Sequence, residues 1–373
     1  MFLDNQKRRF GFGCMRLPMK GEEVDIEQFQ KMVDAFIEAG FTYFDTAHGY
    51  IDGKSETAIK TALTSRYPRD AYSLTNKLTE PYFQREEDIV PFFRSQLEAC
   101  GVDYFDFYLM HAQNARNFEH FKRCRAYETA FELKRQGLVK HVGLSFHDTA
   151  EVLDNILSTY PEVDVVQIQF NYLDYESPTM QSKACYEVCA KHGKPIIVME
   201  PVKGGTLVNL PQRAKQVLDD LKGGSYASYA LRFVLSFPQI AMVLSGMSTM
   251  EQMEDNISFT ADHVPLNEQE LEAIANVRAI FTEAKTIPCT HCSYCVEQNH
   301  CPKGILIPDM FAAYNSKKMF RDWTARAIYH NHLIQDGHGK ASDCIRCGAC
   351  ERACPQKLSI RLLLQEVANE FES

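Results

Sequence analysis

Residues 26–47 read IEQFQKMVDAFIEAGFTYFDTA and join a helix pattern to a strand pattern. Apolar residues recur at helical spacing over 26–39, Gly40 stands where that helix would stop, and the β-rich run 42–47 follows. The same order recurs along the chain, with helix patterns at 87–100, 121–135 and 179–192 that end at Gly101, Gly137 and Gly193. The repeating unit is therefore a helix, a glycine C-cap and a buried strand.

Eight runs have the composition of strands, and several are continuously apolar, as in strands covered on both faces. They are 10–17, 42–47, 72–77, 105–112, 141–147, 165–171, 195–201 and 242–247. Eight β–α alternations with short connections predict an α/β fold, a (β/α)8 TIM barrel. No GxGxxG follows a strand, which weighs against an open dinucleotide-binding sheet.

Two cysteine runs near the C-terminus are typical of iron–sulfur proteins. The first is Cys289-x2-Cys292-x2-Cys295-x5-Cys301-Pro and the second is Cys344-x2-Cys347-x2-Cys350-x3-Cys354-Pro. In bacterial ferredoxin runs, three cysteines hold one cube and the fourth reaches the other. We therefore expect two [4Fe–4S] clusters, one held by Cys289, Cys292, Cys295 and Cys354, the other by Cys301, Cys344, Cys347 and Cys350. The alternative, a pair of zinc sites, fits less well because structural zinc favours two CxxC pairs per ion.

The domain boundary is expected near Ile287-Pro288. The prediction is a barrel over 1–285 and a small, mainly helical ferredoxin-like iron–sulfur domain over 286–373. The spacer between the cysteine runs contains helix patterns at 307–316 and 323–334 and is longer than that of a minimal ferredoxin.

The composition is that of an ordinary globular protein, with 45% hydrophobic and 24% charged residues among 373. A net charge of −9 makes nucleic acid and anionic membranes unexpected partners. Five of the 13 cysteines lie outside the two runs, without regular spacing, which favours a reducing compartment. No signal peptide and no membrane-spanning run is visible, so we expect a soluble cytoplasmic protein.

Four polar side chains fall at the ends of consecutive predicted strands. Asp45 and Tyr50 lie in FDTAHGY, Lys77 ends LTNK, and His111 ends YLMH. Functional residues of such barrels gather at the C-terminal ends of strands. A Lys ammonium beside a tyrosine is expected to lower the phenol's pKa, Asp45 to keep Lys77 charged, and His111 to bind the substrate oxygen. Such a set protonates an oxyanion as hydride reaches a carbonyl carbon.

With all four of these residues in their expected motifs, residues 10–260 resemble the aldo-keto reductases, and the cysteine-rich tail resembles a ferredoxin-fused branch of that family. The resemblance implies an oxidoreductase that converts a small-molecule carbonyl or alcohol with NADPH or NADH. It also implies Tyr50 as general acid/base, with Asp45, Lys77 and His111 as its catalytic partners.

The resemblance also implies cofactor contacts. Ser145 and Gln167 would hold the nicotinamide carboxamide, and Met199 stands where many members stack an aromatic ring. Phe146 replaces the usual Asn beside the carboxamide Ser. The late loop lacks the Lys and Arg that commonly grip a 2′-phosphate, and its candidate contacts are Gly246, Ser248, Thr249, Gln252 and Asn256.

Hydride carries two electrons, whereas an iron–sulfur cube passes one, so coupling the two needs a flavin or radical step. Three alternatives stay open: a flavin at the barrel mouth, a ferredoxin or flavoprotein partner on the tail, or clusters that are structural or sensory. The competing function is a non-catalytic redox sensor that binds nicotinamide and signals through its clusters.

Overall fold

The structure is a computed structural model that describes residues 8–177, 180–261, 264–297, 301–320 and 324–372. Packing divides the chain into two units. The barrel unit comprises Met1–Pro201 and Ala230–Pro265, and the cluster unit comprises Val202–Tyr229 and Leu266–Ser373. The sequence analysis divided the chain differently, into a barrel domain over 1–285 and an iron–sulfur domain over 286–373. Those domain boundaries remain a proposal.

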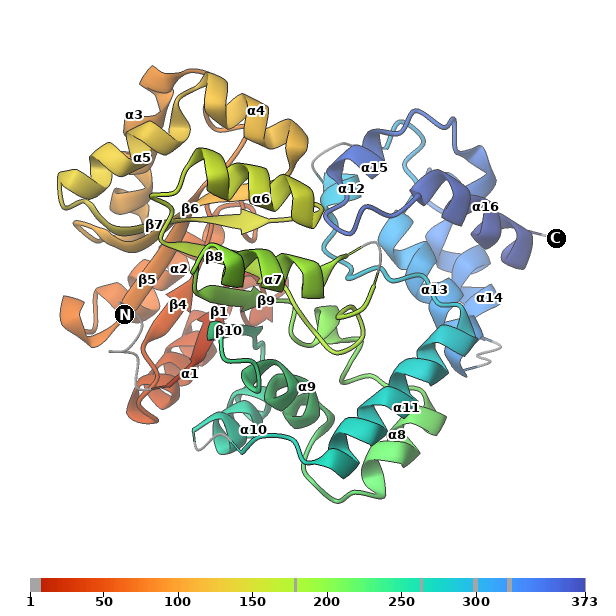
Figure 1. Ribbon diagram of the computed structural model, residues 1–373. Helices are drawn as coiled ribbons and strands as arrows, with labels where there is room; N and C mark the ends of the chain where they lie inside the picture. The colour runs from red at the N-terminus through yellow and green to blue at the C-terminus, as the bar shows by residue number, and fades with distance from the viewer. Residues whose placement is uncertain (1–7, 178–179, 262–263, 298–300, 321–323, 373) are drawn as a thin grey trace. The chain divides into compact units, whose positions relative to one another are not determined.

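The predicted barrel is confirmed, with eight parallel strands closed in the order β1-β10-β9-β8-β7-β6-β5-β4 (Figure 1). The strands are β1 (Phe10–Gly13), β4 (Tyr43–Asp45), β5 (Ser73–Leu78), β6 (Phe105–Gln113), β7 (Val139–Phe146), β8 (Val165–Gln169), β9 (Ile196–Met199) and β10 (Ile240–Gly246). A two-stranded hairpin, β2 (Met19–Lys20) with β3 (Glu23–Val24), follows β1. Because all eight barrel strands are parallel, their C-terminal ends meet at one rim of the barrel.

Inward-facing apolar side chains from several strands fill the barrel. One buried cluster consists of Tyr43, Phe107, Leu109, Val165, Ile197, Met242 and Leu244. The interior is therefore a packed core rather than a pore, and it holds the strand ends in fixed positions.

Helices lie outside the strands of the barrel unit (Figure 1). They are α1 (Ile26–Glu38), α2 (Lys54–Ile59), α3 (Glu86–Cys100), α4 (Ala115–Arg123), α5 (Ala126–Arg135), α6 (Ala150–Thr159), α7 (Ser182–Lys191) and α10 (Met250–Thr260). The four glycines expected to end helices, Gly40, Gly101, Gly137 and Gly193, all have positive φ.

Two predicted helix boundaries differ in the structure. The helix predicted over 121–135 is two helices, α4 and α5, because Arg125 adopts a left-handed conformation (φ 52°) between them. The helix predicted from Thr179 begins at Ser182 as α7; Thr179 itself lies outside the described residues.

All regular elements in the described residues of the cluster unit are helices, as expected. Its helices are α8 (Gln212–Asp219), α11 (Glu268–Ala284), α12 (Tyr294–Glu297), α13 (Ile307–Phe320), α14 (Thr324–Ile328), α15 (Ala349–Ala353) and α16 (Ile360–Phe371). Helix α9 (Tyr226–Leu235) contains the boundary between the two units. Position 323, the predicted start of α14, is outside the described residues.

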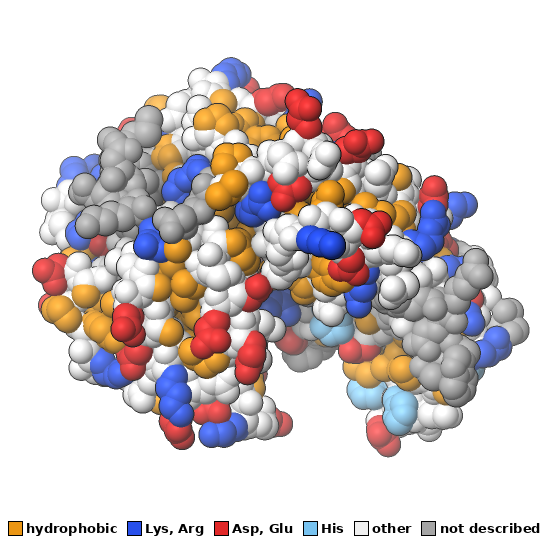
Figure 2. Space-filling view, turned by 90° about the horizontal axis from the view of Figure 1, so that it is seen from below, with side chains coloured by type: hydrophobic (Ala, Val, Ile, Leu, Met, Phe, Trp, Pro, Cys, Tyr) orange, Lys and Arg blue, Asp and Glu red, His pale blue; other side chains and the backbone are white. Residues whose placement is uncertain are grey.

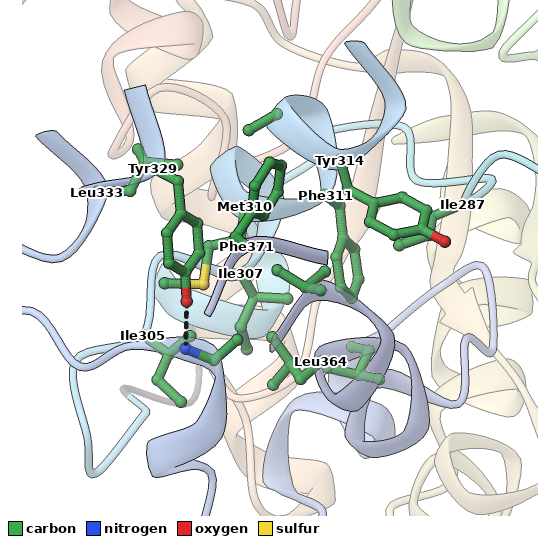
Figure 3. Close-up of a cluster of buried hydrophobic side chains, with 14 of the residues drawn as sticks. Ile287, Ile305, Ile307, Met310, Phe311, Tyr314, Tyr329, Leu333, Leu364 and Phe371 are labelled. Atoms are coloured by element: carbon green, nitrogen blue, oxygen red, sulfur yellow. Dashed lines mark hydrogen bonds between the residues drawn. The ribbon is translucent and has the colours of Figure 1, made fainter. Parts of the chain in front are cut away.

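A small apolar core holds the cluster unit together (Figure 3). The rings of Tyr329 and Phe371 stack at 4.9 Å between centroids. The Tyr329 hydroxyl accepts a hydrogen bond from the backbone N–H of Ala341 at 2.9 Å, drawn as a dashed line in Figure 3. Several cysteines of the two runs, including Cys289, Cys301, Cys344, Cys350 and Cys354, pack against this core.

On the face that Figure 2 shows, basic and acidic side chains are interspersed with hydrophobic ones. None of the helices in the described residues is long and apolar enough to cross a membrane.

The packing of β7 generates a prediction about stability. A Cβ on Gly143 would lie 2.6 Å from Leu109 Cδ2, from Val165 Cγ1 and from the backbone oxygen of Val165. Because a backbone oxygen cannot rotate away, Gly143→Ala should destabilise the barrel by about 1–3 kcal/mol. Urea unfolding followed by far-UV circular dichroism measures this loss.

Gly13→Ala is the matched control, because a Cβ on Gly13 would have its nearest neighbours at 3.5 Å, an ordinary contact distance. Equal unfolding midpoints for the two variants would contradict the packing described here.

Candidate active site and cluster sites

The barrel brings the four predicted catalytic side chains to one rim. Asp45 is the last residue of β4, Lys77 lies at the end of β5 and His111 near the end of β6. Tyr50 lies on the loop that leaves β4 and is half-buried. Parallel pairing of β4 with β5 and of β5 with β6 places the first three on neighbouring strands.

A buried ion pair is at the centre of this site. Lys77 Nζ lies 2.6 Å from Asp45 Oδ1, and the two side chains are 0% and 5% exposed. Lys77 also donates to the backbone oxygen of Thr46 at 2.7 Å. The second carboxylate oxygen of Asp45 accepts a hydrogen bond from the Gln167 amide at 3.1 Å. Both charges are therefore compensated and hydrogen-bonded, as burial requires.

Tyr50 and His111 pack around the ammonium group. Lys77 Nζ lies 4.8 Å from the centre of the Tyr50 ring, a cation–π distance. The rings of Tyr50 and His111 meet edge to face, with centroids 6.1 Å apart. His111 Nδ1 shares a 2.8 Å hydrogen bond with the hydroxyl of Thr79, which the sequence alone did not single out. The four predicted residues therefore form one cluster.

The expected lowering of the Tyr50 pKa is wrong. Burial raises the pKa of Tyr50 well above its usual value, and the negative charges of Asp45 and Glu200 raise it further. Lys77 cannot outweigh these effects, because its ammonium is engaged by Asp45 and faces the ring of Tyr50. The phenol is therefore protonated in the resting site.

Burial also lowers the pKa of the two basic groups. For Lys77, the neighbouring Asp45 carboxylate opposes this effect and favours the charged form. For His111, the positive charge of Lys77 and the neighbouring His147 add to burial, and the pKa falls well below 6.5. The imidazole of His111 is therefore neutral at physiological pH.

The residues expected to contact nicotinamide end neighbouring strands. Ser145 lies in β7, Gln167 in β8 and Met199 at the end of β9. The Ser145 hydroxyl accepts a hydrogen bond from the backbone N–H of Ala112 at 2.8 Å, next to His111. The Gln167 amide donates to Asp45, so Ser145 and Gln167 also form hydrogen bonds to or next to the four predicted catalytic residues.

The late loop after β10 forms a network around the start of α10. Thr249 caps the helix by accepting from the Gln252 N–H, and the Gln252 side chain accepts from the Ser248 N–H at 2.8 Å. Asn256 is buried and donates to Ser245 at 3.4 Å. The five predicted loop residues are thus in one region, and Gly246, the last residue of β10, is exposed there.

Arg16, which the sequence analysis missed, lies in this region. A Cβ on Gly246 would be 3.3 Å from Arg16 Cβ, and the Ser248 hydroxyl donates to the Arg16 backbone oxygen at 3.0 Å. The loop itself lacks Lys and Arg, but the fold brings the stem of an arginine side chain to it from a segment more than 200 residues earlier. No local sequence pattern could have indicated this.

In the cluster unit, the cysteines surround two cavities. The inner site is lined by Cys289, Cys292, Cys295 and Cys354. The outer site is lined by Cys301, Cys344, Cys347 and Cys350, and Cys295 also borders it. These are the two crosswise sets expected from the spacing. In the described part of the chain, no three His, Cys, Asp or Glu side chains converge as ligands of a single ion would.

The inner site also has a polar wall that the sequence analysis missed. Gln356 lines it and is 2% exposed, and neither its amide nitrogen nor its amide oxygen has a partner within the described residues. A buried amide without a partner is costly, so it indicates an absent group with hydrogen-bond acceptors. The sulfides and thiolates of a [4Fe–4S] cube are such acceptors, and the site fits that group.

Lys203 and Gly204 approach the same site. Lys203 is buried, and its positive charge opposes the rise that burial causes in the pKa of Cys289. Gly204 has φ 59°, and a Cβ there would lie 2.4 Å from the backbone oxygen of Thr290, so only glycine fits. The turn that follows β9 in sequence therefore packs against the first cysteine loop within the cluster unit.

Comparison with known families agrees with both parts of the chain. The model of the Aldo/keto reductase family matches residues 9–279, and the model of the 4Fe-4S dicluster domain matches residues 288–359.

Individual relatives are distant. The uncharacterized oxidoreductase YqkF of Bacillus subtilis is 23% identical over 301 residues, covering 71% of this chain and 90% of that protein. The NADH-specific methylglyoxal reductase of Escherichia coli is 23% identical over 276 residues, covering 61% and 82%. An aldo-keto reductase from Klebsiella pneumoniae, solved with NADPH, has a TM-score of 0.59 at 19% identity and covers 72% of this chain and 90% of its own. With a family model that spans most of its length, the chain belongs to the aldo/keto reductase family, as an oxidoreductase enzyme with a 4Fe-4S dicluster domain after its barrel.

Proposed function

We propose that the barrel catalyses the NAD(P)H-linked reduction of a small carbonyl compound, or the reverse oxidation of an alcohol, with Tyr50 as general acid/base. The observation that carries this proposal is the buried Lys77–Asp45 ion pair with the Tyr50 ring 4.8 Å from its ammonium. A protonated phenol beside a fixed positive charge suits proton donation to an oxygen that is gaining negative charge.

His111 would orient the substrate oxygen. Its imidazole is neutral, so one ring nitrogen carries a proton and the other does not. In the tautomer that carries its proton on Nε2, Nδ1 accepts a hydrogen bond from the Thr79 hydroxyl, and Nε2 can donate to a carbonyl oxygen. Thr79 would then act as a positioning residue for the imidazole of His111.

A bound reduced nicotinamide would supply hydride to the carbonyl carbon, and Tyr50 would donate its hydroxyl proton to the carbonyl oxygen. Hydride and proton together convert the carbonyl to an alcohol and leave Tyr50 as a phenolate. The Lys77 ammonium stabilises that phenolate until water reprotonates it, and Asp45 keeps Lys77 charged despite burial.

The strand-end side chains fit a nicotinamide cofactor by their chemistry. Ser145 and Gln167 offer hydroxyl and amide groups for the carboxamide, and Met199 offers an apolar surface. The adenosine part of the cofactor would contact the loop after β10. The contact residues there would be Gly246, Ser248, Thr249, Gln252 and Asn256. Arg16 adds a cation there and supports binding of a phosphate group on NADPH or of the pyrophosphate of either nucleotide.

We further propose that the inner and outer sites each hold a [4Fe–4S] cluster and transfer electrons. Each cube exchanges one electron, so two cubes match the two electrons of one hydride. A flavin bound at the barrel mouth would accept the two electrons of the hydride together and pass them on one at a time. A ferredoxin or flavoprotein would exchange electrons with the clusters.

The five cysteines outside the two sites are buried and form no disulfide in the described residues; they are Cys14, Cys100, Cys124, Cys185 and Cys189. Together with oxygen-sensitive clusters, they support a reducing compartment, the cytoplasm, as the place of action.

Replacing the proposed acid tests the barrel chemistry. Tyr50→Phe keeps the ring beside Lys77 and removes only the hydroxyl. We expect kcat/KM for reduction of a simple aldehyde to fall by about 10²-fold or more, the usual contribution of a positioned proton donor. Binding of NADPH, measured by fluorescence titration, should change little.

Tyr160→Phe is the matched control, because Tyr160 follows α6 outside the catalytic cluster, where its ring stacks on Tyr127 at 4.2 Å. If Tyr50→Phe kept most of its turnover while Tyr160→Phe behaved like the natural protein, Tyr50 would not be the acid.

Gln356→Leu tests the inner site. An amide N–H that donates to a cluster sulfur favours the reduced cluster, so its removal should make one reduction potential more negative. A hydrogen bond of about 1 kcal/mol corresponds to a shift on the order of 40 mV for one electron. Potentiometric titration followed by electron paramagnetic resonance measures each cluster separately.

Gln269→Leu, a substitution on the exposed face of α11, serves as the control. Iron content should be unchanged in both variants. Potentials that stay the same in Gln356→Leu would show that the amide does not contact a cluster.

A further inference from the structure

The two cysteine sites differ in their access to solvent. Cys347 of the outer site is exposed, whereas no cysteine of the inner site is. Electron transfer between proteins slows steeply with distance, so a carrier would reach the outer cluster first. The surface around Cys347 is therefore the place to look for a docking face.

Two arginine side chains converge on the loop that carries Cys347. A Cβ on Gly348 would lie 3.4 Å from Arg352 Nη1 and 3.9 Å from Arg361 Cζ. Arg352 also donates to the backbone oxygen of Cys347 at 3.3 Å. Arg361 is held by Glu351 at 2.8 Å, so its guanidinium has a fixed place.

A third arginine and an apolar side chain complete this surface. Ile345 is a large hydrophobic residue that is 55% exposed, and it borders the outer cavity together with Arg361. Arg346 lies between Ile345 and Cys347 in sequence and donates to Gln365 of α16 at 3.3 Å. The docking face consists of Ile345, Arg346, Cys347, Arg352 and Arg361.

This combination has the composition of a protein interface. Exposed apolar groups next to arginines are enriched in such interfaces, and guanidinium groups bind carboxylates in a fixed geometry. The chain as a whole carries a net charge of −9, so it repels an acidic protein overall. Because Arg361 is paired with Glu351, the exposed Arg346 and Arg352 are the charges that would steer an acidic partner to this face.

We propose that the docking face binds an acidic ferredoxin and that one electron passes between its iron–sulfur centre and the outer cluster. The proposal rests on the proposed function of the clusters in electron transfer. The step forms and breaks no bond: the reduced ferredoxin is oxidised by one electron, and the outer cluster is reduced by one.

The test mixes the anaerobic, cluster-loaded protein with reduced plant-type [2Fe–2S] ferredoxin in a stopped-flow instrument. Arg346→Gln and Arg352→Gln each remove one positive charge from the docking face. Lys222→Gln removes one from an exposed position after α8, which Figure 1 draws at the opposite end of the cluster unit from α15. Reduced methyl viologen, a small cation, serves as a donor that needs no docking.

At low ionic strength we expect each arginine variant to slow reduction by ferredoxin about fivefold or more, because steering by complementary charge raises association rates by about 10-fold to 10³-fold. Added salt should slow the reduction of the natural protein by ferredoxin. It should also reduce the difference in rate between the natural protein and the arginine variants. Lys222→Gln should match the natural protein, and methyl viologen should reduce all four proteins equally.

Equal rates with ferredoxin for all four proteins, or arginine variants slowed equally with methyl viologen, would overturn the docking face and leave the electron-transfer function standing. Clusters that methyl viologen cannot reduce would overturn the electron-transfer function, and the docking face with it.

Discussion

The buried ion pair between Lys77 and Asp45 is the interaction on which the barrel site depends. Two charges with almost no exposure are tolerated only when each is paired and hydrogen-bonded, and here the Thr46 carbonyl and the Gln167 amide complete the set. The pair fixes the ammonium, the ammonium fixes the position of the Tyr50 ring, and that ring packs against His111. Removing either charge would leave the other buried and uncompensated, so Tyr50 and its surroundings form a single unit.

The cluster unit meets a different constraint. Its small apolar core, with Tyr329 stacked on Phe371, carries turns whose cysteines point into two cavities. The inner cavity has the Gln356 amide in its wall, with Lys203 nearby, whereas the outer cavity is lined by Arg361 and by the exposed thiol of Cys347. The two sites therefore offer different surroundings to the groups that they are proposed to hold.

Much of the fold could be predicted because the relevant signals are local. Apolar strand runs, glycine C-caps and the CxxCxxC spacing are each contained in a few residues, and the barrel topology then brings Asp45, Lys77 and His111 together on neighbouring strands. The rest depends on contacts between distant segments. Arg16 reaches Gly246 across more than 200 residues, the turn at Lys203 packs with the cysteine loops, and the unpartnered amide of Gln356 is visible only in three dimensions. The pKa of Tyr50 was predicted in the wrong direction because burial is invisible in the sequence.

The central claim is that the barrel chemistry and the clusters form one redox system. The most direct measurement adds NADPH to the anaerobic, cluster-loaded protein, without substrate, and follows the visible absorbance of the clusters. We expect the absorbance to bleach with one NADPH oxidised per two clusters reduced, since one hydride carries two electrons and each cube accepts one. The same sample, treated with acid, should release a flavin that accounts for the one-electron step. Unchanged absorbance in a sample that still reduces an aldehyde would contradict the claim and leave the barrel as an independent reductase.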